Sequence, residues 1–170
     1  MKSIKNLKVP NRIFLAPMEE VNDLAFRILC KQAGCGLTYT GMIHPLTEQK
    51  LQLEDKPALQ LFSTNGKGIK EFIQKYDKDV SLWDFNLGCP AKTAKRHGFG
   101  YFLCNDIETI EKILKIMRQA TNKPVTIKIR KNKNTLKIAK LAEKIGIDAI
   151  SIHPRTQAQG YSGIVDLDFA

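Results

Sequence analysis

The residue best equipped for chemistry in this sequence is Cys89, which lies in the segment formed by residues 86–90. Three cationic residues, Lys92, Lys95 and Arg96, follow it closely along the chain. Cationic neighbours make a thiol chemically usable. The alternative is that Cys89 is a small buried hydrophobic residue, which is the commoner role of a lone cysteine.

Polar residues stand at equivalent positions in four strand-like segments: Gln60, Asn86, Lys128 and His153. Apolar side chains occupy the alternate positions, so the polar ones face the opposite side of each strand. Two amides, an ammonium and an imidazole suit a planar, polar, anionic ligand. A lysine inside a closed sheet is costly unless a ligand or a carboxylate offsets its charge. We therefore expect Cys89 and Lys128 to face one shared cavity; the alternative is that each polar residue is satisfied in the interior or lies at the surface.

The elements that position these residues are strand-like apolar runs alternating with helix-period segments. Strands are expected at residues 13–16, 37–40, 58–62, 82–86, 125–129 and 149–153. Helices are expected at residues 23–33 and 69–76, from a capping box at Asn105 and Glu108 as far as Met117, and at residues 138–145. Residues 44–56 and 91–100 are expected to be loops.

Strands that alternate with helices imply an α/β fold with a parallel sheet, either doubly wound or closed into a (β/α)8 TIM barrel. A doubly wound dinucleotide-binding sheet carries a G-x-G-x-x-G motif after its first strand. Residues 16–20 contain no glycine, so the barrel is favoured. A complete barrel takes about 250 residues. The 170 residues are therefore expected to form one partial barrel domain, residues 1–170, with about six of the eight βα units.

Composition narrows the class of protein further. Lys and Arg number 27 against 17 Asp and Glu, a formal net charge of +10. This excess of positive charge favours a polyanionic partner, most of all a nucleic acid. The alternative is that the lysines are simply solvated at the surface. No apolar run approaches the ~18 residues of a membrane span, and the basic start has no apolar core of a secretory signal. The four cysteines form no C-x-x-C pair, which favours a cytoplasmic protein without a metal site.

Five segments, in order along the chain, resemble the motifs of the tRNA-dihydrouridine synthase family. They are Leu-Ala-Pro-Met at 15–18 with Val-Asn-Asp at 21–23 and Phe-Arg at 26–27, residues 40–43, Asp-Phe-Asn-Leu-Gly-Cys-Pro at 84–90, residues 125–130, and His-Pro-Arg-Thr-Gln at 153–157 with residues 161–163. The resemblance covers essentially the whole chain. Two departures are Gly41, where the family commonly has Glu, and Pro154, where it usually has a small residue.

The resemblance implies a cytoplasmic, FMN-dependent reductase that converts uridines of tRNA to 5,6-dihydrouridine with NADPH. By position, Cys89 would be the general acid. The flavin would be bound by Ala16, Pro17, Met18, Gln60, Asn86, Lys128 and His153. The tRNA phosphates would be bound by loop residues Lys92, Lys95, Arg96 and Arg130, and Arg155 would contact RNA or the cofactor phosphate.

The resemblance also implies that the last barrel strands and a helical tRNA-binding domain lie outside these 170 residues. Two other functions remain open. The chain is alternatively part of another FMN barrel oxidoreductase that acts on a free pyrimidine, as dihydroorotate dehydrogenases do. The third possibility is a truncated, non-catalytic remnant that binds RNA through its basic surface.

Overall fold

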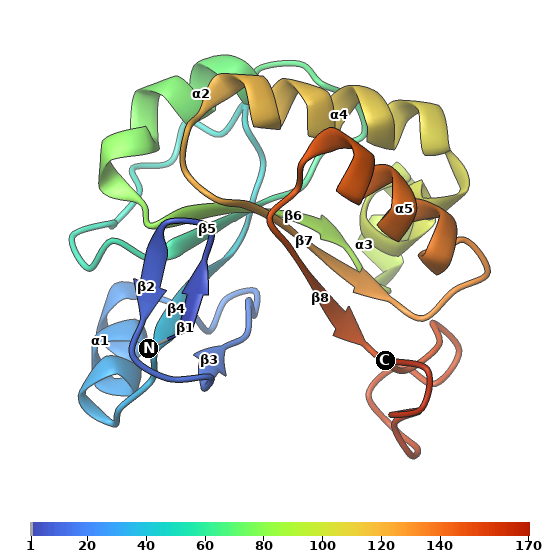
Figure 1. Cartoon of the computed structure of the whole chain (residues 1–170), viewed down its shortest axis with the longest axis horizontal. Helices are drawn as coiled ribbons and strands as arrows, with labels where there is room; N and C mark the ends of the chain where they lie inside the picture. The colour runs from blue at the N-terminus through green and yellow to red at the C-terminus, as the bar shows by residue number, and fades with distance from the viewer. Residues whose placement is uncertain (1) are drawn as a thin grey trace.

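Six parallel strands form one sheet in which neighbours in sequence are also neighbours in space. The structure is a computed structural model and describes residues 2–170. The strands are β3 (Phe14–Leu15), β4 (Leu37–Ile43), β5 (Ala58–Leu61), β6 (Leu82–Leu87), β7 (Val125–Arg130) and β8 (Ala149–His153). The sheet curves into an open half-barrel with β3 and β8 at its edges (Figure 1). The predicted partial (β/α)8 barrel is confirmed.

Helices connect the strands of this half-barrel. They are α1 (Leu24–Gln32), α2 (Ile69–Tyr76), α3 (Lys92–His97), α4 (Ile107–Ala120) and α5 (Thr135–Ile145), with 3-10 helices at Asp77–Asp79 and Gly100–Asn105. Figure 1 shows α2, α4 and α5 side by side above the outer face of the sheet. Within residues 2–170, each helix is too short or too polar to cross a membrane.

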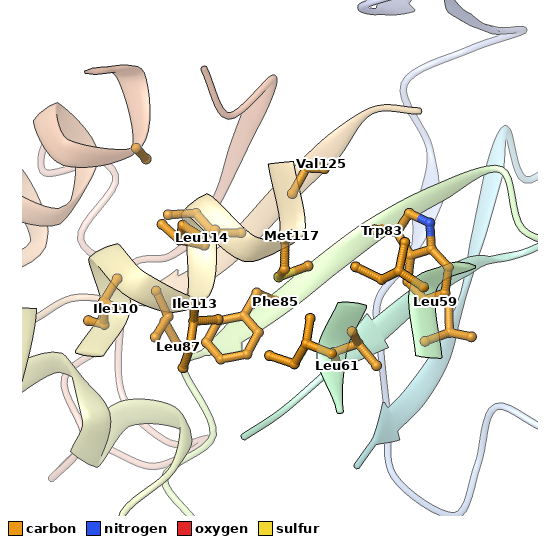
Figure 2. Packing of buried hydrophobic residues seen from close by; sticks show 14 of the residues in the cluster. Leu59, Leu61, Trp83, Phe85, Leu87, Ile110, Ile113, Leu114, Met117 and Val125 are labelled. Atoms are coloured by element: carbon orange, nitrogen blue, oxygen red, sulfur yellow. The ribbon is translucent and has the colours of Figure 1, made fainter. Parts of the chain in front are cut away.

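The main core lies between these helices and the outward side chains of the strands (Figure 2). Trp83, Phe85 and Leu87 alternate along β6 and are buried against α2 and α4. The strand contribution comes from Leu59, Leu61, Trp83, Phe85, Leu87, Val125, Ile127 and Ile129. Burying each large apolar side chain stabilises the fold by roughly 1.5–3 kcal/mol. Because the apolar residues take the outward positions, the polar residues that alternate with them face the inside of the curve, as predicted.

A short antiparallel hairpin precedes the half-barrel and was not predicted from the sequence. It consists of β1 (Lys2–Ile4) and β2 (Leu7–Val9). Ile4 and Leu7 pack against a second cluster of buried residues: Leu37, Tyr39, Ala58 and Leu82. These four residues lie at the amino ends of β4, β5 and β6 or close to them, so the hairpin covers that end of the curved sheet.

Two local predictions were wrong. The N-cap of α4 is Asp106, and not Asn105, because the Asp106 side chain accepts a hydrogen bond from the Thr109 backbone N–H at 3.0 Å. Residues 91–100 are not a loop throughout, since residues 92–97 form α3 and Gly100 begins a 3-10 helix. The run of Lys, Ala and Arg in α3 favours a helix locally, and its buried Ala94 fixes it to the body of the protein.

The strand limits also differ from those expected at the first edge of the sheet. β3 has only two residues, Phe14 and Leu15, because its single neighbour is β4 and Ile13 already lies 70% exposed. β4 extends beyond the predicted residue 40 to Ile43, with a register irregularity against β5 between Tyr39 and Met42. The other expected strands and helices are confirmed to within a few residues, and residues 44–56 form no helix or strand.

Candidate active site

A cavity of about 590 Å³ opens at the carboxyl ends of the strands, inside the curve of the half-barrel. Cys89 and Lys128 both line it, so the thiol and the amine do share one cavity. Its lining includes all eight residues expected there: Ala16, Pro17, Met18, Gln60, Asn86, Cys89, Lys128 and His153. Residues from the ends of six consecutive strands therefore converge on this space, which is where β/α barrels carry their functional sites.

A buried carboxylate anchors the floor of this cavity. Asp84 is fully buried and accepts hydrogen bonds from Thr126 Oγ1 at 2.5 Å and from Gln60 Nε2 at 2.6 Å. Burial raises the pKa of Asp84 to about 6, although the bonds from Thr126 and Gln60 and the charge of Lys128 lower it. Because Gln60 Nε2 donates to this carboxylate, the orientation of the Gln60 amide is fixed, with Oε1 on the side of Asn86.

The amide of Asn86 continues this chain of hydrogen bonds to Cys89. Asn86 Nδ2 donates to Gln60 Oε1 at 2.8 Å. Asn86 Oδ1 accepts from the backbone N–H groups of Gly88 at 3.1 Å and Cys89 at 2.9 Å. The turn that presents the thiol is thus held by a side chain of β6, which in turn is oriented by Gln60 and Asp84.

A glycine on the neighbouring 3-10 helix makes room for the cysteine. Gly100 has φ +61°, and a Cβ there would lie 2.9 Å from the Cys89 carbonyl oxygen and 3.0 Å from the Cys89 Cβ. The Tyr101 backbone N–H donates to the same carbonyl at 3.1 Å. A larger residue at position 100 would both strain the backbone and push the thiol away.

Lys128 and His153 contribute the cationic and imidazole groups. Burial lowers the pKa of Lys128, while the charge of Asp84 raises it. Burial also lowers the pKa of His153 to about 4, and the charges of Arg130, Lys128 and Arg155 add to this effect. His153 is therefore neutral at pH 7. Its Nε2 lies 3.3 Å from Arg155 Nη1, which can only donate, so the ring proton belongs on Nδ1.

The prediction that Arg130 lies in a loop was wrong, while its expected contact with RNA stays a prediction, since Arg130 also lines the cavity. It is the last residue of β7 and only 1% exposed. Its guanidinium donates to the carbonyl oxygens of Gly88 at 3.2 Å, Thr156 at 3.1 Å and Gly160 at 2.7 Å, and its Cζ lies 5.7 Å from the ring centroid of Tyr161. Through these bonds of its Nε and Nη1, Arg130 ties the end of β7 to the segment that follows β8.

The other basic residues expected to meet RNA lie at the rim of the cavity. Lys92, Lys95 and Arg96 are exposed on α3, which begins shortly after Cys89. Arg155 follows β8, is partly buried and donates to the Gly163 carbonyl at 3.1 and 3.2 Å. The α3 cations thus remain available to solvent, whereas Arg155 is already engaged.

Several residues of this site received no role in the sequence interpretation. Asp84 and Thr126 were given no role, and Glu19, which accepts from the Met42 backbone N–H at 3.2 Å, was not singled out. The signal for Asp84 was its place two residues before Asn86 on the same face of β6. Nothing in the sequence pattern marks Gly100 as the residue against Cys89, because that contact depends on how the 3-10 helix folds back.

The fold and the position of the cavity define this chain as part of a (β/α)8 barrel with its site at the usual end of the strands. The sequence profile of the dihydrouridine synthase family (Dus) matches residues 14–169. The chain belongs to this family.

Individual relatives carry the same family name. The chain is 34% identical over 172 residues to tRNA-dihydrouridine synthase B of Pseudomonas aeruginosa, covering 91% of this chain and 52% of that protein. It is 34% identical over 184 residues to tRNA-dihydrouridine synthase B of Pasteurella multocida, covering 97% of this chain and 55% of that protein. The chain thus spans about half the length of the curated relatives it matches.

Proposed function

We propose that this chain carries the flavin cavity and the proton donor of an FMN-dependent enzyme that reduces uridines in tRNA to 5,6-dihydrouridine, with NADPH as the reductant. The observation that carries this proposal is that Cys89 and Lys128 line one cavity at the carboxyl ends of the strands. Membership of the dihydrouridine synthase family supports the reaction, and the relatives named tRNA-dihydrouridine synthase B support tRNA as the substrate.

The donor set of the cavity fits FMN. Within residues 2–170 the Lys128 amine takes part in none of the five ion pairs, and burial works against its charge. An electron-rich ring beside this amine lowers the cost of keeping it charged. The neutral His153 offers an N–H donor, the Gln60 and Asn86 amides are held in one orientation, and residues 16–18 give an apolar wall.

The residues of the chain complete the reaction that the flavin begins. Bound FMN supplies the hydride for C6 of the uracil ring. The Cys89 thiol donates the proton to C5, so that the C5=C6 double bond becomes a single bond and the thiol is left as a thiolate. The Asn86 side chain keeps the Cys89 backbone in place through its bond at 2.9 Å. General acid catalysis of this kind contributes roughly 10²–10⁴-fold to a rate.

The substrate reaches the cavity as a base that has left its stack. Lys92, Lys95 and Arg96 on α3 would bind the phosphates on either side of this nucleotide, since they are exposed near Cys89. The buried Arg130 supports the end of β7.

Replacing the thiol tests the proposal. Cys89→Ala should lower dihydrouridine formation in tRNA by about 100-fold or more, measured by mass analysis of the nucleosides, while the flavin absorbance of the purified protein is unchanged. Cys30→Ala, on α1 and outside the cavity, is the matched control and should keep full activity.

An unchanged yield of dihydrouridine in Cys89→Ala would contradict the assignment of the general acid. Turnover of a free pyrimidine without RNA would favour the other FMN barrel enzymes. A colourless protein that binds tRNA and leaves its uridines intact would favour the non-catalytic remnant.

A further inference from the structure

A second cavity of about 570 Å³ lies beside the first at the same end of the sheet. Glu19 and Met42 line both cavities, so the two spaces share a wall. The other wall residues follow the carboxyl ends of β3, β4, β5 and β6, and no role in the proposed reaction has been given to them. The second cavity is therefore adjacent to the place where the target uridine would lie.

Aromatic rings form one wall of the second cavity. Phe62 is partly exposed, and its ring centroid lies 4.4 Å from that of the buried Phe99. His44 meets Phe62 edge-on at 5.3 Å. The His44 Nδ1 accepts the Leu46 backbone N–H at 3.2 Å, which places the proton of the neutral ring on Nε2. The wall thus offers a supported aromatic face and an N–H donor, which is a surface typical of proteins that stack a nucleobase.

This cavity has a basic helix on one side and two carboxylates on the other, which suits the phosphate and the base of a nucleotide. Thr93 and His97 line it from α3, the helix that also carries Lys92, Lys95 and Arg96. The carboxylates of Glu19 and Glu20 line it from the segment after β3, three strands away from β6 in the sheet. A phosphate would therefore bind at the α3 side, and the N–H groups of a base edge would be accepted at the Glu19 side.

We propose that this second cavity binds the base of a nucleotide next to the target uridine, stacked on Phe62, with the connecting phosphate against α3. This inference rests on the proposed function and adds a specificity subsite to it. The wall shared by the two cavities supports this proposal, because two adjacent nucleotides of a single strand would occupy two adjacent cavities.

Binding of short RNA tests the subsite without any catalytic step. The probe is a fluorescein-labelled uridine pentamer, with a second series in which one uridine beside the central one is replaced by an abasic nucleotide. Phe62→Leu should weaken binding of the pentamer by about tenfold, since stacking of one base is lost. Phe62→Tyr keeps the ring and should bind normally. Phe169→Leu makes the same change at an exposed aromatic residue outside both cavities and should have no effect.

The decisive comparison is whether the effect of Phe62→Leu on affinity and the effect of the abasic nucleotide add together. The wild-type protein should lose about tenfold in affinity for one of the abasic pentamers, and Phe62→Leu should lose nothing more on that same RNA. FMN binding should be equal in all variants, because Phe62 does not line the first cavity.

Equal weakening of both RNAs by Phe62→Leu would overturn the subsite while leaving the proposed function intact, as would a raised KM for NADPH in place of weaker RNA binding. A protein that binds FMN but neither RNA would overturn the subsite and also the RNA substrate of the proposed function.

Discussion

At the scale of single residues, the site depends on a chain of hydrogen bonds in which the donor and the acceptor of each bond are fixed. Asn86 Oδ1 accepts two backbone N–H groups, so its Nδ2 must face Gln60 Oε1. Gln60 Nε2 must then face Asp84. A buried carboxylate thereby sets the orientation of both amides and of the turn at Cys89. Each amide that loses its partner inside the protein would cost about 1–3 kcal/mol.

The ionisation of Asp84 gives this network a dependence on pH. Burial raises the pKa of Asp84 from 3.8 to about 6 in the folded protein. Because the folded state holds this proton more tightly than the unfolded state, the resulting stability is complete below about pH 4 and is lost as the pH rises through about 6. The difference corresponds to roughly 3 kcal/mol.

Asp84→Asn removes this titration and keeps the bonding, because its oxygen can accept from Gln60 and its amide can donate to the Thr126 hydroxyl. The free energy of unfolding of the wild-type protein should therefore fall relative to that of Asp84→Asn between pH 4 and pH 7, as measured in urea. Parallel profiles for the two proteins would mean that Asp84 does not carry the raised pKa.

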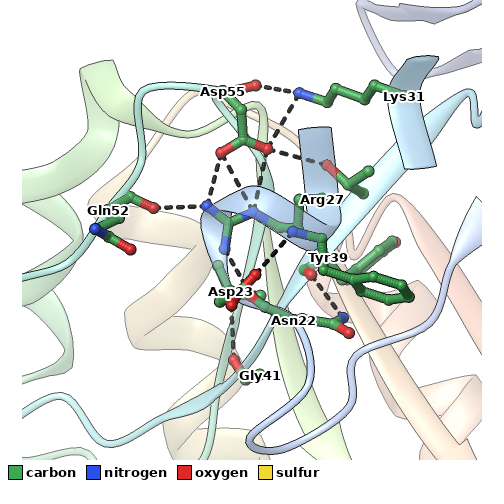
Figure 3. Close-up of polar contacts among 11 residues, drawn as sticks. Asn22, Asp23, Arg27, Lys31, Tyr39, Gly41, Gln52 and Asp55 are labelled. Carbon is green, nitrogen blue, oxygen red and sulfur yellow. Dashed lines mark hydrogen bonds and ion pairs between the residues drawn. The ribbon is translucent and has the colours of Figure 1, made fainter. Parts of the chain in front are cut away.

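At the scale of the elements, an ion pair connects α1 to the segment between β4 and β5 (Figure 3). Arg27 and Asp55 are both almost fully buried, and Arg27 Nη2 lies 2.7 Å from Asp55 Oδ1. The Arg27 guanidinium also donates to the carbonyl oxygens of Asn22 at 2.7 Å and Gln52 at 2.6 Å. Burial alone would raise the pKa of Asp55, but the hydrogen bond and charge of Arg27 and the charge of Lys31 hold it below its usual value.

Arg27→Met should lower the free energy of unfolding by about 3–5 kcal/mol, because it leaves the Asp55 carboxylate buried without its main partner. The double variant Arg27→Met with Asp55→Leu should recover part of that loss, since no buried charge remains. Urea unfolding of both variants at pH 7 measures the effect. A single variant as stable as the wild-type protein would show that the ion pair does not hold α1 in place.

The elements also show which parts of the fold a sequence reveals. The alternating strands from β4 to β8 and helices α2, α4 and α5 repeat their apolar pattern over enough residues to be recognised. The hairpin β1–β2 has strands of three residues each, and its stability comes from packing against Leu37 and Leu82, which no local pattern reveals. Helix α3 is six residues long, too short for a helical period to stand out from a basic run.

The residues of the site were likewise predictable where a local pattern marks them. The residues that the strands themselves direct inward, Gln60, Asn86 and Lys128, were predictable from alternation and meet in one cavity. Arg130 was misplaced because alternation does not show that the segment after β8 folds back to take its guanidinium. Contacts between segments far apart in sequence therefore account for most of what the sequence did not predict.

At the scale of the whole molecule, the net charge of +10 must be distinguished from the cations that face the site. Lys137, Lys140 and Lys144 are exposed on α5, in the outer helical layer. Lys92, Lys95 and Arg96 are exposed on α3, close to Cys89. Long-range attraction draws a polyanion to both sets, but only cations in contact with phosphates release bound counterions.

The salt dependence of RNA binding separates these two contributions. For single-stranded RNA, each phosphate contact adds about −0.7 to the slope of log K against log salt concentration. Replacing the three α3 cations by Ala should therefore make the slope for the uridine pentamer shallower by about 2. Replacing the three α5 lysines by Ala removes the same charge and should leave the slope nearly unchanged. Fluorescence anisotropy between 50 and 300 mM KCl, roughly the range over which such slopes are resolved, measures both. Equal changes of slope in the two triple variants would mean that RNA is attracted by net charge alone and is not bound at the rim of the cavity.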